Sequence, residues 1–173
     1  MVGKRNIRNY FVCSEIITFE VIEMKQAKVL TEKELKKVID YIDAFDKHAH
    51  RNKVIVLLTH YCGMRVNEVA SLLVSDVVDD EGEVNDVIHL TANQTKGSGS
   101  RRVFVSKKAK TALKQYLQSD LSVIQRVYLF NTQKSKRFNT NALTQLIKRL
   151  YERSGIRGAS SHSGRRSFIT NLA

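Results

Sequence analysis

Apolar residues recur at helical spacing over most of the chain after residue 30, and this pattern restricts the fold to a mainly helical one. Thr31 and Glu34 form a capping box, in which a hydroxyl at the N-cap is followed three residues later by a carboxylate. The apolar residues that follow predict a helix to about Lys47. Similar patterns predict further helices over residues 52–62, 64–73, 106–118 and 140–153, with Ser106 and Thr140 as N-caps.

Two short runs of β-formers interrupt the helical pattern, at residues 87–90 and 102–105. A glycine- and serine-rich loop with cationic flanks, residues 94–101, lies between them. We therefore expect a small antiparallel sheet in an α+β, mainly α-helical domain. Residues 16–22 alternate partly like a strand, but residues 1–28 as a whole form an N-terminal segment of uncertain structure.

Charge is distributed very unevenly along the chain. Residues 91–173 contain seventeen Lys/Arg against two Asp/Glu, a net of +15, whereas residues 31–90 contain seven against twelve. A basic half of this kind favours a polyanion as partner, with nucleic acid ahead of an anionic membrane surface. No apolar run approaches the roughly 18 residues of a membrane span. The two cysteines are too few for a disulfide framework, and a buried Cys62 thiol suits the reducing cytoplasm.

Cations stand at constrained places in three separate segments. Arg65 lies at a junction between two helices, Lys96 lies in the glycine-rich loop, and His162 and Arg165 share one face at the start of the last helix. Ser161 or Ser163 is placed to cap that helix, whose positive end favours a phosphate. Taken singly, each segment has a structural alternative. Arg65 could be an ion-pair partner of Glu68, Lys96 a solvated loop lysine, and the His162–Arg165 segment a basic start of a surface helix.

In order along the chain, these segments resemble the catalytic domain of the tyrosine recombinases, the phage-integrase family of DNA breaking-and-rejoining enzymes. The first segment is Gly63-Met64-Arg65-Val66-Asn67-Glu68, followed by Leu72 and Ser75-Asp76. The second is Thr95-Lys96-Gly97 followed by Arg102-Val103-Phe104-Val105, with Phe104 where a proline is common in the family. The third is His162-Ser163-Gly164-Arg165-Arg166-Ser167-Phe168.

The resemblance implies site-specific DNA recombination or integration through a phosphotyrosyl intermediate. In this scheme Arg65 and Arg165 hold the non-bridging phosphate oxygens, Lys96 is the general acid, and His162 donates a hydrogen bond or assists proton transfer. Glu68 braces the arginine helix. The scheme requires no metal and no small-molecule cofactor, and its partners are double-stranded DNA and other recombinase subunits. The remaining cations expected to contact DNA are Arg101, Arg102, Lys107 and Arg166.

The sequence departs from the family where the family has its nucleophile. Tyrosine recombinases continue beyond the His-x-x-Arg helix to a tyrosine, whereas eight residues follow Arg165 here and none is a tyrosine. We therefore interpret residues 29–173 as a partial catalytic domain that binds a DNA phosphate without cleaving it through its own tyrosine. The alternatives are a non-cleaving DNA-binding module derived from an integrase and a basic RNA- or ribosome-binding domain.

Overall fold

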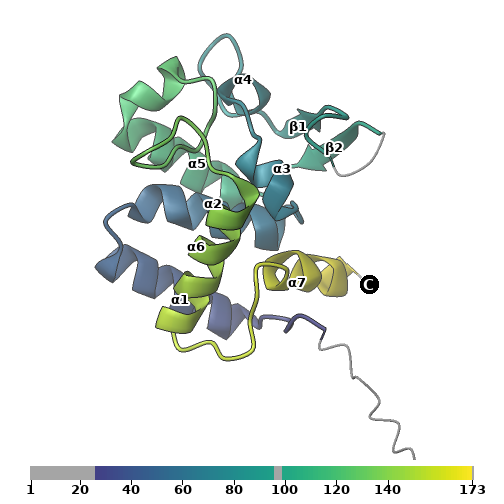
Figure 1. The fold of residues 1–173 in the computed structure, drawn as a ribbon. Helices are drawn as coiled ribbons and strands as arrows, with labels where there is room; N and C mark the ends of the chain where they lie inside the picture. The colour runs from purple at the N-terminus through teal and green to yellow at the C-terminus, as the bar shows by residue number, and fades with distance from the viewer. Residues whose placement is uncertain (1–25, 96–98, 173) are drawn as a thin grey trace, which may run out of the picture.

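The computed structural model describes residues 26–95 and 99–172, so Lys96 and the strand-like residues 16–22 lie outside the described part. The fold is mainly helical with one two-stranded antiparallel sheet, as the sequence predicts (Figure 1). Strand β1 (Val87–Leu90) pairs with β2 (Arg101–Phe104), with Val87 opposite Phe104 and Leu90 opposite Arg101. The helices are α1 (Glu32–Phe45), α2 (Ala49–Tyr61), α3 (Val66–Ala70), α4 (Val74–Val77), α5 (Lys107–Ser119), the 3₁₀ helix η1 (Leu121–Gln125), α6 (Thr140–Arg153) and α7 (Ser163–Leu172).

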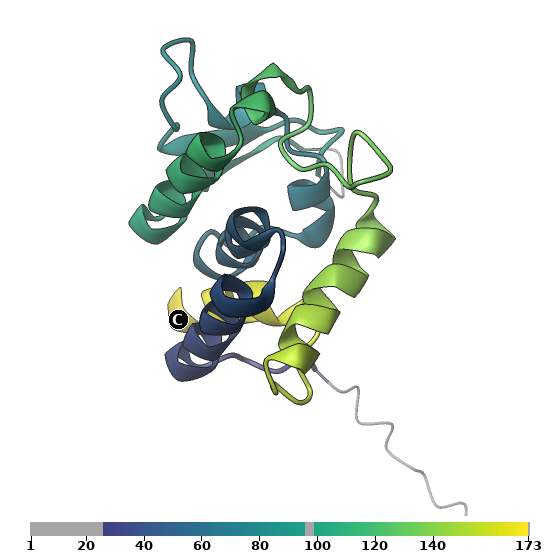
Figure 2. The same ribbon diagram turned by 90° about the vertical axis from the view of Figure 1, so that its left-hand side faces the viewer.

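Helix α2 lies at the centre of the molecule, with α1, α5 and α7 packed around it (Figures 1 and 2). Val54, Ile55, Val56 and Leu58 are fully buried on successive faces of α2. A helix segment enclosed on all sides has no polar stripe, which explains why residues 54–58 of α2 are continuously apolar. In the described residues, no helix is both long and apolar enough to cross a lipid bilayer.

The single helix expected over residues 64–73 is wrong, because within that range the chain is helical only from Val66 to Ala70 (α3), and the next helix, α4, begins at Val74. Helix α3 ends at Ala70, and the backbone of the next residues pairs with the segment 127–129 instead of continuing the helix. Leu72 O accepts a hydrogen bond from Leu129 N at 2.9 Å, and Val74 N donates to Val127 O at 3.0 Å. These long-range bonds replace the intrahelical bonds that the local pattern predicts.

Two glycines allow α7 to pack closely against α2 and the α2–α3 junction. Gly63 has a φ of +61°, and a Cβ built on it would lie 2.2 Å from Cδ1 of the Phe168 ring. A Cβ built on Gly164 would lie 2.5 Å from Thr59 Oγ1 and 3.3 Å from the backbone nitrogen of His60. Any side chain at either position would push α7 away from its neighbours. The glycines therefore determine where the first turn of α7 lies.

Replacing Gly63 by alanine is expected to destabilise the protein by more than about 2 kcal/mol. The left-handed backbone alone costs an L-residue about 1–2 kcal/mol, and the new methyl group also overlaps the Phe168 ring. Urea unfolding measures the change. Gly82→Ala is the matched control for the backbone effect alone, because Gly82 has a φ of +84° and open space around it. Equal losses in the two variants would contradict the proposed packing of Phe168 on Gly63.

The start of α7 is also tied to the segment before α1. Leu30 N donates to Ser167 Oγ at 2.7 Å, and Ser167 Oγ donates in turn to Ser163 O at 2.9 Å. Ser167 and Ser163 are both fully buried. Because these hydroxyl contacts lie one turn from Arg165, they hold the backbone that carries this arginine.

Candidate functional site

Glu68 organises the site as a fully buried carboxylate near the start of α3. Its Oε2 accepts a hydrogen bond from the backbone nitrogen of Arg65 at 2.7 Å, which caps the helix. Its Oε1 accepts from Arg65 Nη1 at 2.9 Å, and its Oε2 also accepts from Arg101 Nη2 at 2.9 Å. Such charge-assisted hydrogen bonds are short and directional. One buried carboxylate therefore holds two guanidinium groups from distant parts of the chain.

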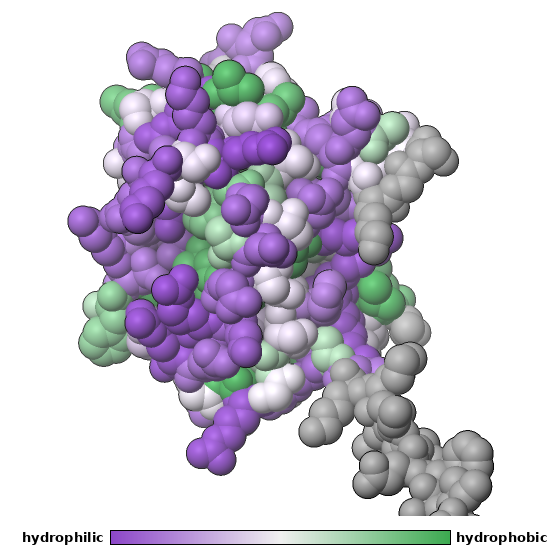
Figure 3. All heavy atoms as spheres, in the orientation of Figure 1, coloured by the Kyte–Doolittle hydropathy of each residue, from purple (hydrophilic) through white to green (hydrophobic). Residues whose placement is uncertain are grey.

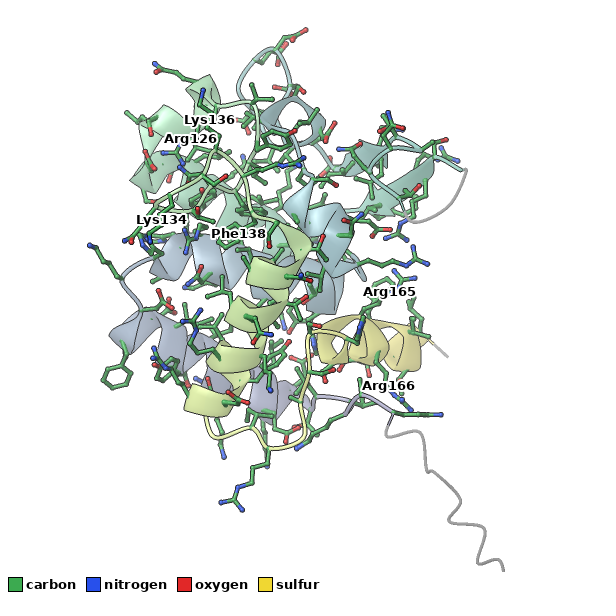
Figure 4. The ribbon with its side chains drawn as sticks, in the orientation of Figure 1. Arg126, Lys134, Lys136, Phe138, Arg165 and Arg166 are labelled. Carbon is green, nitrogen blue, oxygen red and sulfur yellow. The ribbon has the colours of Figure 1, made fainter. Side chains whose placement is uncertain are left out.

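Arg165 brings a third guanidinium to the same place. It extends from α7, and its Nη1 donates to Gly63 O at the α2–α3 junction (Figure 4). Arg101 Nη2 approaches the same carbonyl oxygen at 3.4 Å. Burial lowers the pKa of Arg165, the positive charges of Arg65 and Arg101 lower it further, and Glu68 acts in the opposite direction. The lowered pKa of Arg165 therefore reflects its burial first and the neighbouring like charges second.

The arginine cluster, defined as Arg65, Arg101 and Arg165, contains three positive charges against the one negative charge of Glu68. The Arg65 and Arg101 side chains remain 42% and 31% exposed, so an anion can approach them from solvent. Arg101 Nε is buried without a hydrogen-bond partner in the described structure. A cluster with surplus positive charge and partly exposed guanidinium groups is suited to bind a multiply charged oxyanion such as a phosphodiester in its transition state.

The other predicted site residues in the described part of the chain form no hydrogen bond with Glu68 or with the carbonyl oxygen of Gly63. His162 is exposed immediately before α7, three residues from Arg165, and its ring makes no hydrogen bond to a described residue. Arg102 and Lys107 are exposed, and Arg166 donates to Gln26 Oε1. Lys96 lies outside the described residues, so the structure does not test its expected position.

Gln94 anchors the loop that leads toward Lys96, and the sequence patterns did not single it out for this. Its Nε2 donates to Asp76 Oδ2 at 2.5 Å and to Ser71 O at 3.2 Å, while its Oε1 accepts from Thr91 N at 2.9 Å. Asn67 Nδ2 donates to Gln94 O at 3.4 Å. The side chain is nearly buried. This network attaches residues 91–95 to α3, the helix that begins after Arg65.

Two expected helix caps are corrected by the structure. Asn139 caps α6, because its Oδ1 accepts from Ala142 N at 2.7 Å, whereas Thr140 Oγ1 donates to Asn67 Oδ1 at 2.9 Å. At α7, Ser163 is the first helical residue, and its Oγ accepts from Ser160 N at 2.9 Å rather than from the helix. In both cases the hydroxyl that was expected to cap the helix forms its hydrogen bond with a group outside that helix.

In the described part of the chain, no tyrosine hydrogen-bonds to a guanidinium group of the arginine cluster. Tyr61 donates to Glu32 and accepts from Lys108, Tyr116 donates to Leu129 O, and Tyr128 lies under Arg137. Tyr151 is fully buried, and burial raises its pKa. No group of three or more His, Cys, Asp or Glu side chains within residues 26–95 and 99–172 is arranged to hold a metal ion.

Comparison with known proteins identifies the arrangement. The model of the phage integrase family matches residues 28–173. Tyrosine recombinase XerA of Pyrococcus furiosus is 28% identical over 146 residues, which are 84% of this chain and 48% of that protein. Tyrosine recombinase XerC of Pseudomonas fluorescens is 31% identical over 151 residues, which are 87% of this chain and 48% of that protein. The chain thus spans about half the length of the curated relatives that it matches.

The fold comparison agrees with the sequence comparison. A crystal structure of XerA recombinase superimposes with a TM-score of 0.68 at 28% identity, covering 85% of this chain and 50% of that one. XerH site-specific recombinase, solved in a pre-cleavage complex with its difH substrate, superimposes with a TM-score of 0.64 at 24% identity, covering 84% and 42%. At that identity the XerH match supports the fold alone.

Proposed function

Because this chain belongs to the phage integrase family, we propose that it provides the phosphate-binding part of a tyrosine recombinase active site. The reaction is site-specific recombination by DNA strand breakage and rejoining, as in the XerA and XerC recombinases that it resembles. One observation supports this assignment above the others. Three guanidiniums, from α3, β2 and α7, converge on the buried Glu68 and the carbonyl of Gly63.

In the proposed reaction a tyrosine hydroxyl attacks the scissile phosphorus, loses its proton to water, and forms a 3′-phosphotyrosyl bond as the bond to the 5′-oxygen breaks. Negative charge builds up on the non-bridging oxygens in the transition state, where donors from Arg65 and Arg165 stabilise it. Lys96 protonates the departing 5′-oxygen, and His162 donates a hydrogen bond to the phosphate. Rejoining reverses these steps. We assign none of the described tyrosines as this nucleophile, because none of them hydrogen-bonds to the arginine cluster.

The proposed partners are double-stranded DNA and further recombinase subunits, and the proposed location is the cytoplasm. Residues 29–173 form the proposed catalytic unit. Arg102 and Lys107 are exposed and suited to contact the DNA backbone, while Arg166 already donates one hydrogen bond to Gln26 Oε1. The buried free thiol of Cys62 supports a reducing compartment.

A non-cleaving DNA-binding module is the second candidate, favoured by the engagement of the described tyrosines elsewhere. Covalent adducts with nicked duplexes, tested in the presence of a tyrosine-bearing recombinase subunit, separate the two candidates. If this chain contributes to the reaction site, Arg165→Ala should abolish the covalent adducts that form only when this chain is present, while DNA affinity is largely kept. The absence of any chain-dependent adduct would favour the module.

Binding to duplex DNA is expected to weaken steeply with salt. If three to four phosphates are neutralised, the logarithm of the affinity falls with the logarithm of salt concentration with a slope of about −3. Arg165→Ala should make that slope shallower by about 0.9, whereas Glu152→Ala should leave it unchanged because it removes no cation. Fluorescence anisotropy measures both. Tighter binding of structured RNA than of duplex DNA at matched salt would refute the assignment to DNA.

A further inference from the structure

A second surface of the molecule, remote from the arginine cluster, exposes apolar side chains that a soluble domain would ordinarily cover. Leu121, Ile124 and Val127, in and just after η1, are 72%, 49% and 70% exposed. The space-filling view shows apolar surface at the top of the molecule, where η1 lies in Figure 1 (Figure 3). We call these three residues the η1 patch. Contiguous exposed apolar groups with a polar rim are typical of protein–protein contacts.

The acidic turn, residues 79–83, borders the η1 patch on one side. Asp79, Asp80, Glu81 and Glu83 are all exposed there. Glu83 is paired with Lys114 at 2.5 Å, while Asp80 and Glu81 form no ion pair with a described residue. Asp79 Oδ1 accepts from the backbone nitrogens of Glu81 and Glu83, which fixes the shape of the turn. This edge therefore presents negative charge that its own neighbours leave unneutralised.

The basic loop, residues 134–137, borders the η1 patch on the opposite side. Lys134, Lys136 and Arg137 are exposed and form no ion pair with a described carboxylate. Arg137 instead lies over the Tyr128 ring, 5.5 Å from its centroid. A groove of about 430 Å³ with a mainly apolar surface is lined by both Val127 and Lys136. Figure 2 shows the acidic turn, η1 and the basic loop in this order along one end of the molecule.

We propose that this end of the molecule binds a second copy of the same chain across a two-fold axis. A two-fold contact joins the same patch on both subunits, so one end of each patch meets the opposite end of its partner. Here the acidic turn of one copy meets the basic loop of the other, twice, around a shared apolar centre. The groove beside Val127 accommodates an apolar side chain from the partner's η1 patch. Complementary charges at the rim select this pairing and its orientation.

Reversing the charges of the basic loop and of the acidic turn tests whether this surface forms the dimer. In sedimentation velocity of the full chain without DNA, the wild-type protein is expected to show a concentration-dependent dimer at low salt. Lys134→Glu with Lys136→Glu should abolish it, and so should Asp80→Lys with Glu81→Lys, because each places like charges opposite one another at both ends. An equimolar mixture of the two double variants should restore a dimer, since both turn–loop contacts at the rim are then complementary.

The control is Lys37→Glu, which reverses a charge on an exposed residue of α1 away from this surface. It should leave dimer formation unchanged, and circular dichroism melts verify that every variant folds. A wild-type chain that stays monomeric at concentrations of about a millimolar overturns the proposal. So does a dimer that both charge reversals leave intact, or a mixture of variants that fails to reassociate, because another partner or surface would then account for the patch.

Discussion

Replacing Arg165 by alanine is expected to weaken the binding of orthovanadate, an analogue of a pentacoordinate phosphoryl group, by about 10- to 150-fold. This range corresponds to losing about 1.5–3 kcal/mol of hydrogen bonding to a charged group. Arg165 stands beside Arg65 and Arg101, and its Nη1 already bonds to Gly63 O, so its remaining donors are held in place. Isothermal titration calorimetry at constant salt measures the affinity.

Arg149→Ala is the matched control for this prediction, because Arg149 is an exposed arginine on α6. It removes the same charge and should leave vanadate affinity within about twofold, since an exposed charge beyond a Debye length of about 10 Å is largely screened. Arg165→Lys should fall between wild type and alanine, because lysine keeps the charge and loses the planar fork. Equal effects of Arg165→Ala and Arg149→Ala would show that the anion responds to overall charge rather than to this cluster.

Replacing Glu68 by alanine is expected to destabilise the fold by about 3–5 kcal/mol, the usual cost of removing one partner from a buried ion pair. The variant loses the cap on the Arg65 nitrogen and the shared partner of Arg65 and Arg101. It also places three guanidiniums together without a counter-charge. Guanidinium chloride unfolding measures the loss, which should shrink when phosphate is added, because a bound anion replaces part of the missing negative charge.

Glu152→Ala serves as the control for Glu68→Ala. Glu152 pairs with Lys148 at 3.7 Å on the exposed face of α6, where an ion pair contributes about 0–1 kcal/mol. A Glu68→Ala variant that is no less stable than Glu152→Ala would mean that Glu68 does not hold the arginine cluster together.

Local patterns predicted the elements whose ends are determined locally. The capping box of Thr31 and Glu34 is formed as expected at α1, and Ser106 caps α5 through Ala109 N. The two strands and their antiparallel pairing also follow from the sequence. By contrast, the break after α3 depends on hydrogen bonds between Leu72 and the distant Leu129. No property of residues 64–73 alone could reveal that partner.

From the sequence, only the family resemblance indicated that Arg65 and Arg165 belong to one site. Arg101 was predicted to contact DNA without a role in that site. The structure places Arg101 on Glu68, because β2 alternates and Arg101 faces the same way as the buried Val103, while Arg102 faces outward. The alternation along residues 101–104 can be seen in the sequence. The sequence does not show that the inward-facing side of this strand lies against Glu68. The close approach of Phe168 to Gly63 likewise depends on the packing of α7, which no local spacing encodes.

The central claim is that Arg65 and Arg165 hold one phosphate between them, with Glu68 and Arg101 supporting the site. Vanadium anomalous diffraction from crystals of the full chain soaked in orthovanadate tests it most directly. We expect one dominant peak, with oxygens about 2.7–3.1 Å from guanidinium nitrogens of both Arg65 and Arg165. Vanadate bound at the basic loop of residues 134–137 instead, with the arginine cluster empty, would contradict it.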